Sequence, residues 1–294
     1  MSAPTALAAT AGDLDHPGLL RRTFASPRAW VGAGALLAVV AWGLLGSLLL
    51  PADATAPDST AFARPPSADH WFGTTDIGQD LFALTTLGLR TSLAVALVAA
   101  PLATALAAVV GSVAGYVGGR VGRLLVWMID LALVLPSFYL LVLVSPLLGG
   151  ASWLAAALAI AGFGWMVMAR VVRGQAASLR ERDFVRAAVY LGASTSQVLR
   201  RHVLPHLASL LVVDLTVGVG AAVLTEATLG WVGLGVTAPA VSLGTLLAAG
   251  SPAALTRPWL FWFPALVLVW AVLATSLLGE AVRDALDPAG DRRG

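Results

Sequence analysis

Residues 180–205 read RERDFVRAAVYLGASTSQVLRRHVLP and form a charged stretch between two very apolar segments of the chain. From Arg180 to Leu191 the apolar and charged residues recur with a helical period, which predicts an amphipathic helix. Gly192 ends this helix, because glycine adopts the left-handed conformation at a helix C-terminus at little cost. The stretch therefore predicts a helix that stops at a glycine corner.

A second helix is predicted directly after this corner. Ser194 and Gln197 have the spacing of a capping box, in which the two side chains satisfy backbone N–H groups at a helix start, and Pro205 limits how far the helix runs. We call residues 174–206 the elbow. Its bent shape and exposed corner suit docking into a groove of another protein, whereas an arginine-rich amphipathic stretch can also rest on anionic lipid. Spacing alone leaves both alternatives open.

The composition is that of an integral membrane protein. Of 294 residues, 58% are hydrophobic and 12% are charged, against about 25% charged in a typical soluble domain. The chain contains no lysine, so it lacks the phosphate-binding lysine of a conventional ATPase loop. It also contains no cysteine, which excludes disulfides, thiolate catalysis and cysteine-ligated metals, and its net charge of +2 gives no indication of a nucleic-acid partner. We expect a chain without its own catalytic site, metal or cofactor.

Six apolar segments are long enough to cross a bilayer, which takes about 20 residues. They predict an all-α integral membrane protein with six transmembrane helices. A cleaved signal peptide is the alternative for the first segment, but the apolar region of such a peptide is typically about 7–15 residues long. The predicted spans cover residues 29–50, 90–115, 124–148, 153–172, 207–225 and 259–279.

The arginines orient these spans. All of them except Arg64, Arg90 and Arg257 fall in segments assigned to one side, and basic residues resist translocation, so that side is predicted to be the cytoplasm and to hold both termini. The predicted organisation is a tail over 1–28, a first span over 29–50, an external loop over 51–88, a core of five spans over 89–284 that contains the elbow, and a tail over 285–294.

The external loop is acidic and is predicted to end in an interfacial helix. Asp76 and Gln79 have capping-box spacing, and Leu81, Leu84 and Leu87 give an apolar stripe at helical spacing. We favour a plain interfacial anchor over a substrate site for this helix.

The segment that follows the fifth span is too rich in glycine for a simple span. Irregular backbone at membrane depth persists only where protein or a water-filled cavity satisfies its polar groups. The segment is therefore predicted to line or close a pathway, with Glu226, Gly230, Gly233 and Gly235 as candidate residues.

Three carboxylates lie within predicted spans, namely Asp130, Asp214 and Glu226. They suggest a proton relay, but pairing with an arginine or capping of a helix end is favoured, because no further carboxylate or histidine is spaced to continue a relay. His202 and His206 are four residues apart, yet no glutamate or third ligand accompanies them, so a metal site is not expected.

The elbow carries a known motif. Residues 186–192 (RAAVYLG), followed after nine residues by 202–205 (HVLP), resemble the EAA motif of ABC importer permease subunits, although Arg186 replaces its glutamate and His202 its isoleucine. The wider sequence resembles the dipeptide/oligopeptide/nickel branch of this binding-protein-dependent family, and specifically its C-type subunit. The segments that carry this resemblance are 182–194, 201–205, 72–80 (FGTTDIGQD), 224–236 and 283–288.

The resemblance implies a MetI-like type I importer fold in a multi-pass protein of the bacterial inner membrane. It implies that the elbow is a coupling element seated in a cytoplasmic ATPase, present as two subunits or one fused chain that binds ATP and Mg. It also implies a homologous second permease and an extracytoplasmic binding protein that delivers peptides. Nickel or glutathione as the substrate, and a proton-coupled secondary carrier, are the alternatives. The implied coupling residues are Arg182, Asp183, Arg186, Ala187, Ala188, Leu191, Gly192, Ala193, Ser194, Gln197 and Pro205.

Overall fold

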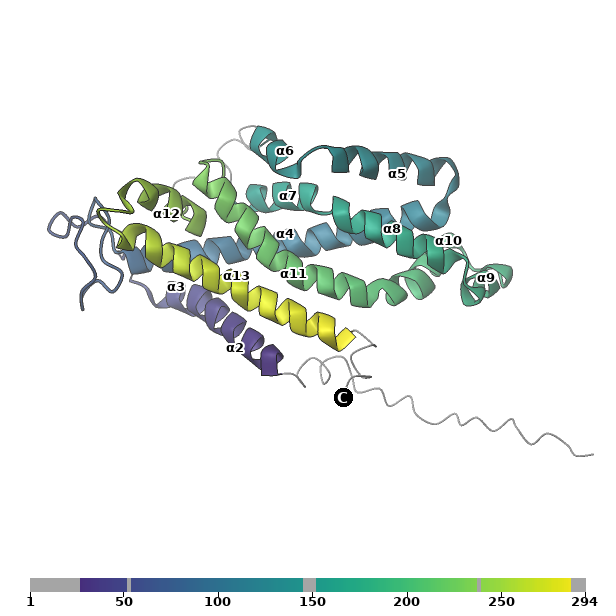
Figure 1. The fold of residues 1–294 in the computed structure, drawn as a ribbon, viewed down its shortest axis with the longest axis horizontal. Coiled ribbons are helices and arrows are strands. Elements are labelled where there is room, and N and C mark those ends of the chain that lie inside the picture. Colours follow the sequence, from purple (N-terminus) through teal and green to yellow (C-terminus); the bar gives the residue numbers. More distant parts are fainter. Residues whose placement is uncertain (1–26, 52–53, 145–151, 237–238, 287–294) are drawn as a thin grey trace, which may run out of the picture.

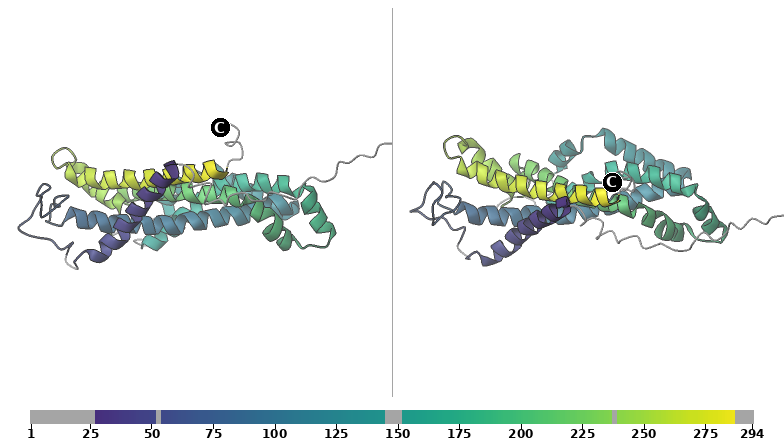
Figure 2. Two further views of the ribbon diagram at one scale, coloured as in Figure 1. Left: turned by 90° about the horizontal axis from the view of Figure 1, so that it is seen from below. Right: turned by 60° about the horizontal axis from the view of Figure 1, so that its bottom comes forward.

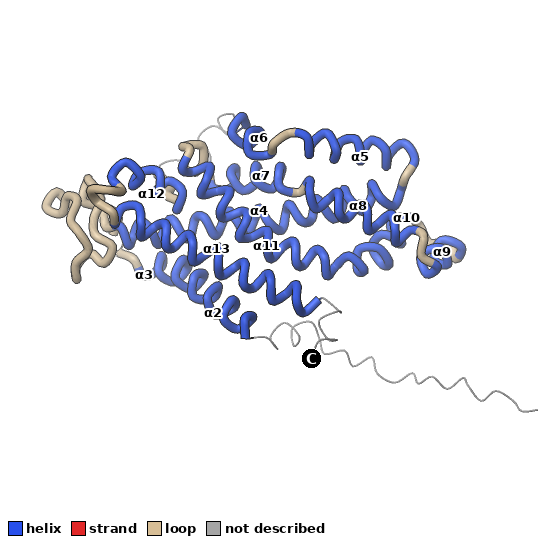
Figure 3. The backbone as a smooth tube through the Cα atoms, viewed as in Figure 1, coloured by secondary structure: helices blue, strands red, loops and turns tan. Residues whose placement is uncertain are grey.

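The computed structural model describes residues 27–51, 54–144, 152–236 and 239–286 (Figure 1). In these ranges helices alternate with loops and no strand is formed (Figure 3), so the all-α prediction is confirmed for them. Parts of five predicted segments lie outside the described residues. These are 1–26 of the N-terminal tail, 52–53 of the external loop, 145–148 of the third span, 237–238 of the glycine-rich segment and 287–294 of the C-terminal tail.

The helices lie side by side in an elongated bundle (Figure 1). The loop over residues 54–80 and helix α12 lie at one end, which we call the loop end, and α9 and α10 lie at the other, the elbow end. The helices are α2 (Pro27–Ala41), η1 (Trp42–Gly46), α3 (Ser47–Leu49), α4 (Leu81–Val117), α5 (Gly119–Val134), α6 (Ser137–Val144), α7 (Trp153–Gly164), α8 (Met166–Arg180), α9 (Asp183–Tyr190), α10 (Thr195–Val198), η3 (Leu199–Val203), α11 (Leu204–Trp231), α12 (Leu243–Gly250), η4 (Ser251–Ala253) and α13 (Trp259–Leu286).

Four continuous helical segments are long and apolar enough to cross a membrane: Ala29–Leu49, Leu81–Val117, Thr195–Trp231 and Trp259–Ala285. Two further pairs of consecutive helices are long and apolar enough to cross a membrane when each pair is counted as one bent span. The pair α5 and α6 bends by 84°, and the pair α7 and α8 bends by 43°. The described residues therefore contain between four spans and the six that the sequence predicts.

The bend between α5 and α6 has a local cause. Leu135 has extended backbone angles, φ −84° and ψ 123°, directly before Pro136. A proline ring disfavours the helical region for the residue before it, so the helix stops there and restarts at Ser137 in a new direction.

The predicted interfacial helix is wrong as a separate element. Leu81, Leu84 and Leu87 belong to the first turns of α4, which continues without a break to Val117. Its N-cap is Asp80, whose Oδ1 accepts a hydrogen bond from the backbone N–H of Ala83 at 2.9 Å. The predicted capping pair of Asp76 and Gln79 does not form, because Asp76 pairs with Arg257 and the Gln79 side chain donates to the carbonyl oxygen of Thr55.

Pro205 does not end the second helix of the elbow as predicted. It lies in the first turn of α11, after the π-helical segment η3, and the helical path from Thr195 runs on to Trp231. The π-helical segment η3 directly before the proline changes the hydrogen-bond register of the helix, which accommodates the missing N–H without ending the helical path. The elbow is therefore continuous with a long apolar helix.

Helix α4 lies at the centre of the bundle and packs most closely on α8. A Cβ atom at Gly111 would lie 2.5 Å from the carbonyl oxygen of Ala169, and one at Gly115 would lie 2.3 Å from that of Arg173. The two glycines are four residues apart on one face of α4, the spacing that allows close backbone contact between membrane helices. On another side, α2 crosses α13 obliquely (Figure 2), and Val39 of α2 is buried with Leu93 of α4 and Ala271 of α13.

Candidate functional site

The corner of the elbow has the geometry that the glycine predicts. Gly192 has a φ of +85°, its N–H donates to the carbonyl of Val189 at 2.9 Å, and the N–H of Ala193 donates to that of Ala188 at 3.0 Å. These two bonds form a Schellman motif, which closes the C-terminus of α9. The helix begins at Asp183 rather than at the predicted Arg180, since Arg180 ends α8.

The second helix of the elbow starts with the predicted capping box. The backbone N–H of Ser194 donates to Oε1 of Gln197 at 2.8 Å, and the N–H of Gln197 donates to Oγ of Ser194 at 3.4 Å. The bonds fix the direction in which α10 leaves the corner. The prediction of a capped helix at this point is confirmed.

The elbow is anchored to the bundle by a small apolar core. Val185 of α9 and Val198 of α10 are buried in one cluster with Val172 and Ala176 of α8 and Leu207 of α11. A close-packed core transmits displacement instead of absorbing it. Movement of the corner is therefore coupled mechanically to α8 and α11.

Large apolar side chains are exposed at the tip of the elbow. Tyr190 and Leu191 are each 89% exposed, and Phe184 and Val189 of the same helix are also exposed. Isolated exposed apolar residues are ordinary, but a contiguous group with a charged rim is typical of a protein interface. The sequence predicts an exposed corner, and the structure shows Tyr190 and Leu191 exposed there, at one end of the molecule (Figure 1).

The charged rim contains the predicted polar residues. Arg186 forms an ion pair with Glu181, while Arg182 and Asp183 are exposed at the start of α9. Between this rim and the end of α4 lies a hollow of about 570 Å³, lined among others by Tyr116, Arg180 and Arg186. Ala187, Ser194 and Gln197 are exposed, and Ala188 and Ala193 are half-buried.

The two histidines of the elbow have packing roles. The Phe184 ring stacks on the His206 ring with centroids 4.8 Å apart, and Nδ1 of His206 contacts the carbonyl oxygen of His202. Among the described residues, no group of three or more potential metal ligands comes together. The histidines therefore stabilise the base of the elbow.

Each carboxylate inside the bundle has its own partner. Asp130 lies 3.7 Å from the guanidinium of Arg170, Thr104 donates a hydrogen bond to Asp214 at 2.6 Å, and Ser92 donates one to Glu226 at 2.6 Å. Asp130 pairs with α8, whereas Asp214 and Glu226 pair with two different hydroxyl groups of α4, and none of these contacts links one carboxylate to another. This arrangement supports local pairing over a proton relay.

The glycines of the predicted pathway segment meet backbone atoms. Gly233 has a φ of +80° and ends α11 in a Schellman motif, with its N–H bonded to the carbonyl of Gly230. A Cβ atom at Gly235 would lie 2.7 Å from Cα of Gly230, and one at Gly230 would lie 3.0 Å from Cα of Gly244. These glycines let the end of α11 pack against the short helix α12. The glycine content of the sequence did not predict this helix–helix contact.

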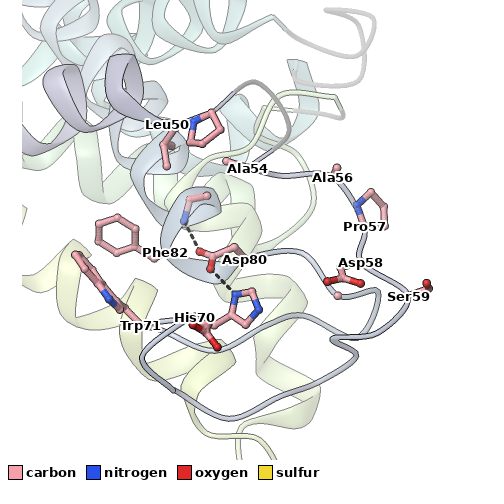
Figure 4. A pocket seen from close by; sticks show the side chains of 14 residues that line it. Leu50, Ala54, Ala56, Pro57, Asp58, Ser59, His70, Trp71, Asp80 and Phe82 are labelled. Atoms are coloured by element: carbon pink, nitrogen blue, oxygen red, sulfur yellow. Dashed lines mark hydrogen bonds and ion pairs between the residues drawn. The ribbon is translucent and has the colours of Figure 1, made fainter.

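The loop end contains a hollow of about 670 Å³ (Figure 4). Trp71 and Phe82 line one side of it, and Asp58 lies across from them. Asp80 accepts a hydrogen bond from Nδ1 of His70 at 2.8 Å in addition to capping α4, so the loop is tied to the start of that helix. Hydrogen bonds from the backbone N–H and the hydroxyl of Thr60 lower the pKa of the Asp58 carboxyl below its ordinary value.

Acid is expected to loosen the turn around Asp58. A carboxyl whose pKa is lower in the folded loop than in the unfolded chain stabilises the loop at neutral pH, and that contribution declines from about pH 4 downward and is lost as the pH falls through the lower pKa of the folded loop. Hydrogen exchange should show the protection factor of the Thr60 amide falling between pH 7 and pH 3. In an Asp58→Asn control, which cannot ionise, this change should disappear, and an equal change in the control would contradict the assignment.

Comparison with known proteins agrees with the geometry of the elbow. Residues 107–291 match the family model described as "Binding-protein-dependent transport system inner membrane component". The "Oligopeptide transport system permease protein OppC" of Mycobacterium tuberculosis H37Rv is 44% identical over 275 residues, which cover 92% of this chain and 94% of that protein. The protein of the same name from Bacillus subtilis 168 is 34% identical over 226 residues, which cover 76% of this chain and 73% of that protein. The chain therefore belongs to the family of inner membrane permease components of binding-protein-dependent transport systems.

Proposed function

We propose that this chain is the C-type permease subunit of an ATP-driven importer of di- and oligopeptides. It forms half of the translocation pathway with a homologous second permease, and it uses the elbow to engage separate ATPase subunits. The observation that carries the proposal is the tip of the elbow, where Tyr190 and Leu191 are each 89% exposed on a base anchored to α8 and α11. A contiguous apolar tip on a rigid base suits insertion into a preformed cleft.

The proposed topology has six spans with both termini in the cytoplasm. Each bent pair then counts as one span, so the elbow falls between the fourth and the fifth. The rule that arginine-rich segments stay inside supports a cytoplasmic elbow, which holds Arg180, Arg182, Arg186, Arg200 and Arg201. In Figure 1, α13 also ends toward the elbow end, in agreement with a cytoplasmic C-terminus.

The proposed coupling is mechanical. ATP-driven closure of the ATPase pair displaces the corner around Leu191 and Gly192, and the apolar core of the elbow passes this displacement to α8 and α11. Such a movement is a rigid-body transition that alternates access between the two ends of the bundle. ATP and Mg are bound by the ATPase, and this chain contributes no lysine for that purpose.

Peptides are the proposed substrates because the relatives described above are named oligopeptide permeases. A binding protein on the external side would deliver them to the loop end. Importers of nickel or glutathione, which use similar permeases, are the second choice. A proton-coupled carrier is disfavoured, since Asp130, Asp214 and Glu226 are each occupied by a separate partner.

Site-specific crosslinking tests the coupling. The natural chain has no cysteine, so Leu191→Cys can carry a single maleimide-linked photocrosslinker. In the importer purified from native membranes, we expect this position to crosslink to a nucleotide-hydrolysing subunit. Leu255→Cys is the matched control, because Leu255 is 98% exposed but lies between η4 and α13. Failure of Leu191→Cys to capture an ATPase, or capture by both positions, would overturn the proposal.

A further inference from the structure

A buried carboxylate joins three helices at the loop end. Glu226 of α11 is 0% exposed, and its Oε2 accepts a hydrogen bond from the hydroxyl of Ser92 on α4 at 2.6 Å. The Ser92 oxygen in turn accepts the backbone N–H of Leu243, the first residue of α12, at 3.2 Å. A directed chain of hydrogen bonds therefore runs from α12 through α4 to α11.

Helix α12 rests on its neighbours through close backbone contacts at its glycines and through the buried side chains of Leu243, Leu246 and Leu247. A Cβ atom at Gly244 would lie 2.4 Å from the carbonyl oxygen of Ala227, and one at Gly88 would lie 3.1 Å from the carbonyl carbon of Ser242. The helix has eight residues, which is far short of the roughly 20 needed to span a bilayer. It is therefore a short cover seated on α4 and α11, and its C-terminal Gly250 lies against the backbone of α13 at Leu260.

Free volume lies on two sides of the segment that leads into α12. A hollow of about 390 Å³ reaches Arg90 and Trp153, and a second of about 380 Å³ reaches Leu246 and Leu260. Both are lined by Gln79, Leu84, Ala240 and Val241. The segment around Ala240 and Val241 therefore forms a thin wall between two hollows, with space into which it can move.

The polar chain suits a contact that must open. The Glu226 carboxylate lies beside two hydroxyl groups near the start of α12, those of Ser92 and of the N-cap residue Ser242, so it faces the junction that would open. When α12 separates, Glu226 and the N–H of Leu243 both gain access to water, which offsets the loss of the bonds. Leu243, Leu246 and Leu247 of α12 are buried in the closed form, so separation also exposes apolar area. The opening of α12 therefore requires work, which the ATP-driven movement of the importer would supply.

We propose that Ser92 and Glu226 are positioning residues that latch α12 across the external mouth of the pathway, and that α12 leaves α4 and α11 when the importer opens outward. The inference rests on the proposed function, since it assigns the loop end to the external side. If the proposal is correct, loss of the Ser92–Glu226 hydrogen bond exposes α12 and does not only weaken the contact between α4 and α11.

The chain supplies a matched control for this distinction. Thr104 donates to Asp214 at 2.6 Å, so the same two helices are joined by the same kind of hydroxyl–carboxylate bond. This second pair does not contact α12 through any hydrogen bond of the described residues. Removal of the Thr104 hydroxyl should therefore weaken the join between α4 and α11 without freeing α12.

Labelling of α12 tests the latch in the complete importer, reconstituted with its partner subunits. Leu247→Cys places one thiol in α12 at a position that is 7% exposed in the closed form, in a chain with no other cysteine. Without nucleotide, Ser92→Ala is expected to raise the rate of labelling by an external, membrane-impermeant maleimide roughly tenfold, as for loss of one buried hydrogen bond. Glu226→Ala should do the same, and the double variant should add little. Glu226→Gln keeps an acceptor oxygen and should stay near the wild-type rate.

Two outcomes would overturn the latch. One is an unchanged labelling rate in Ser92→Ala. This variant keeps a small residue on α4, so it is expected to fold, and it remains informative even if Glu226→Ala fails to assemble. The other is an equal increase in Thr104→Ala. The response of the Leu247→Cys parent to ATP and vanadate tests the opening of α12, and ATP-driven peptide uptake by the same vesicles tests the proposed function separately. Uptake without any change in labelling would overturn the opening of α12, whereas absence of ATP-driven uptake would refute the proposed function.

Discussion

Gly192→Asp is expected to reduce substrate-stimulated ATP hydrolysis by the reconstituted importer to its basal rate while the membrane complex still assembles. Gly192 has a φ of +85°, a conformation that costs a residue with a side chain about 1–2 kcal/mol. A Cβ atom at this position would meet no heavy atom within 4 Å, so the substitution creates no clash within the chain. The new carboxylate would instead enter the ATPase cleft beside Tyr190 and Leu191, where burial of an unpaired charge is costly.

Two further variants separate the backbone from the charge. Gly192→Ala retains the strain without the charge and should give a smaller loss of coupled hydrolysis. Gly119→Asp is the matched control, because Gly119 also has a positive φ, of +60°, and open space around its Cβ position, but it is the first residue of α5. Unchanged hydrolysis in Gly192→Asp, or an equal loss in Gly119→Asp, would refute the assignment of the corner to the ATPase.

The elbow could be predicted from the sequence because its signals are local. The Schellman turn at Gly192 and the capping box of Ser194 and Gln197 each depend on residues within five positions of one another. Backbone angles and caps of this kind require no knowledge of the remaining fold. The same holds for the break before Pro136, which follows from the conformation that proline imposes on Leu135.

Features that depend on distant residues were missed or wrong. The polar residues around Asp76 and Gln79 suggested a new interfacial helix, but the helix starts at Leu81 because Asp80 caps it, and Leu81 is buried against Leu260 of α13. Glu226 was identified as a membrane carboxylate, yet its partner Ser92 lies 134 positions away in the sequence. No hydropathy pattern shows which helix faces such a group, so the latch is visible only in the fold.

The glycines of α4 show the same limit. Gly111 and Gly115 have the spacing of a helix-packing motif, but spacing alone does not say which helix lies opposite. In the structure the opposite backbone is that of α8, at Ala169 and Arg173. The contact therefore joins the centre of the bundle to the helix that leads into the elbow.

Gly115→Leu is expected to prevent stable folding, so that the chain no longer accumulates in the membrane with its partners. The Cβ atom alone would lie 2.3 Å from the carbonyl oxygen of Arg173, and that oxygen belongs to the backbone of α8 and cannot rotate away. The two helices would have to separate, which would also open the contact at Gly111. Overpacking of this kind costs about 1–3 kcal/mol or more, a large part of the stability of a typical domain. Recovery of the intact complex by size-exclusion chromatography measures the effect.

Gly174→Leu provides the control for size and hydrophobicity. Gly174 lies on α8 directly after Arg173, and a Cβ atom there would meet no heavy atom within 4 Å. The same leucine on the outer side of the same helix should therefore leave accumulation and elution near those of the natural chain. Normal recovery of Gly115→Leu would show that α4 and α8 are not in backbone contact. The displacement of the elbow would then have to reach the pathway through α11 alone.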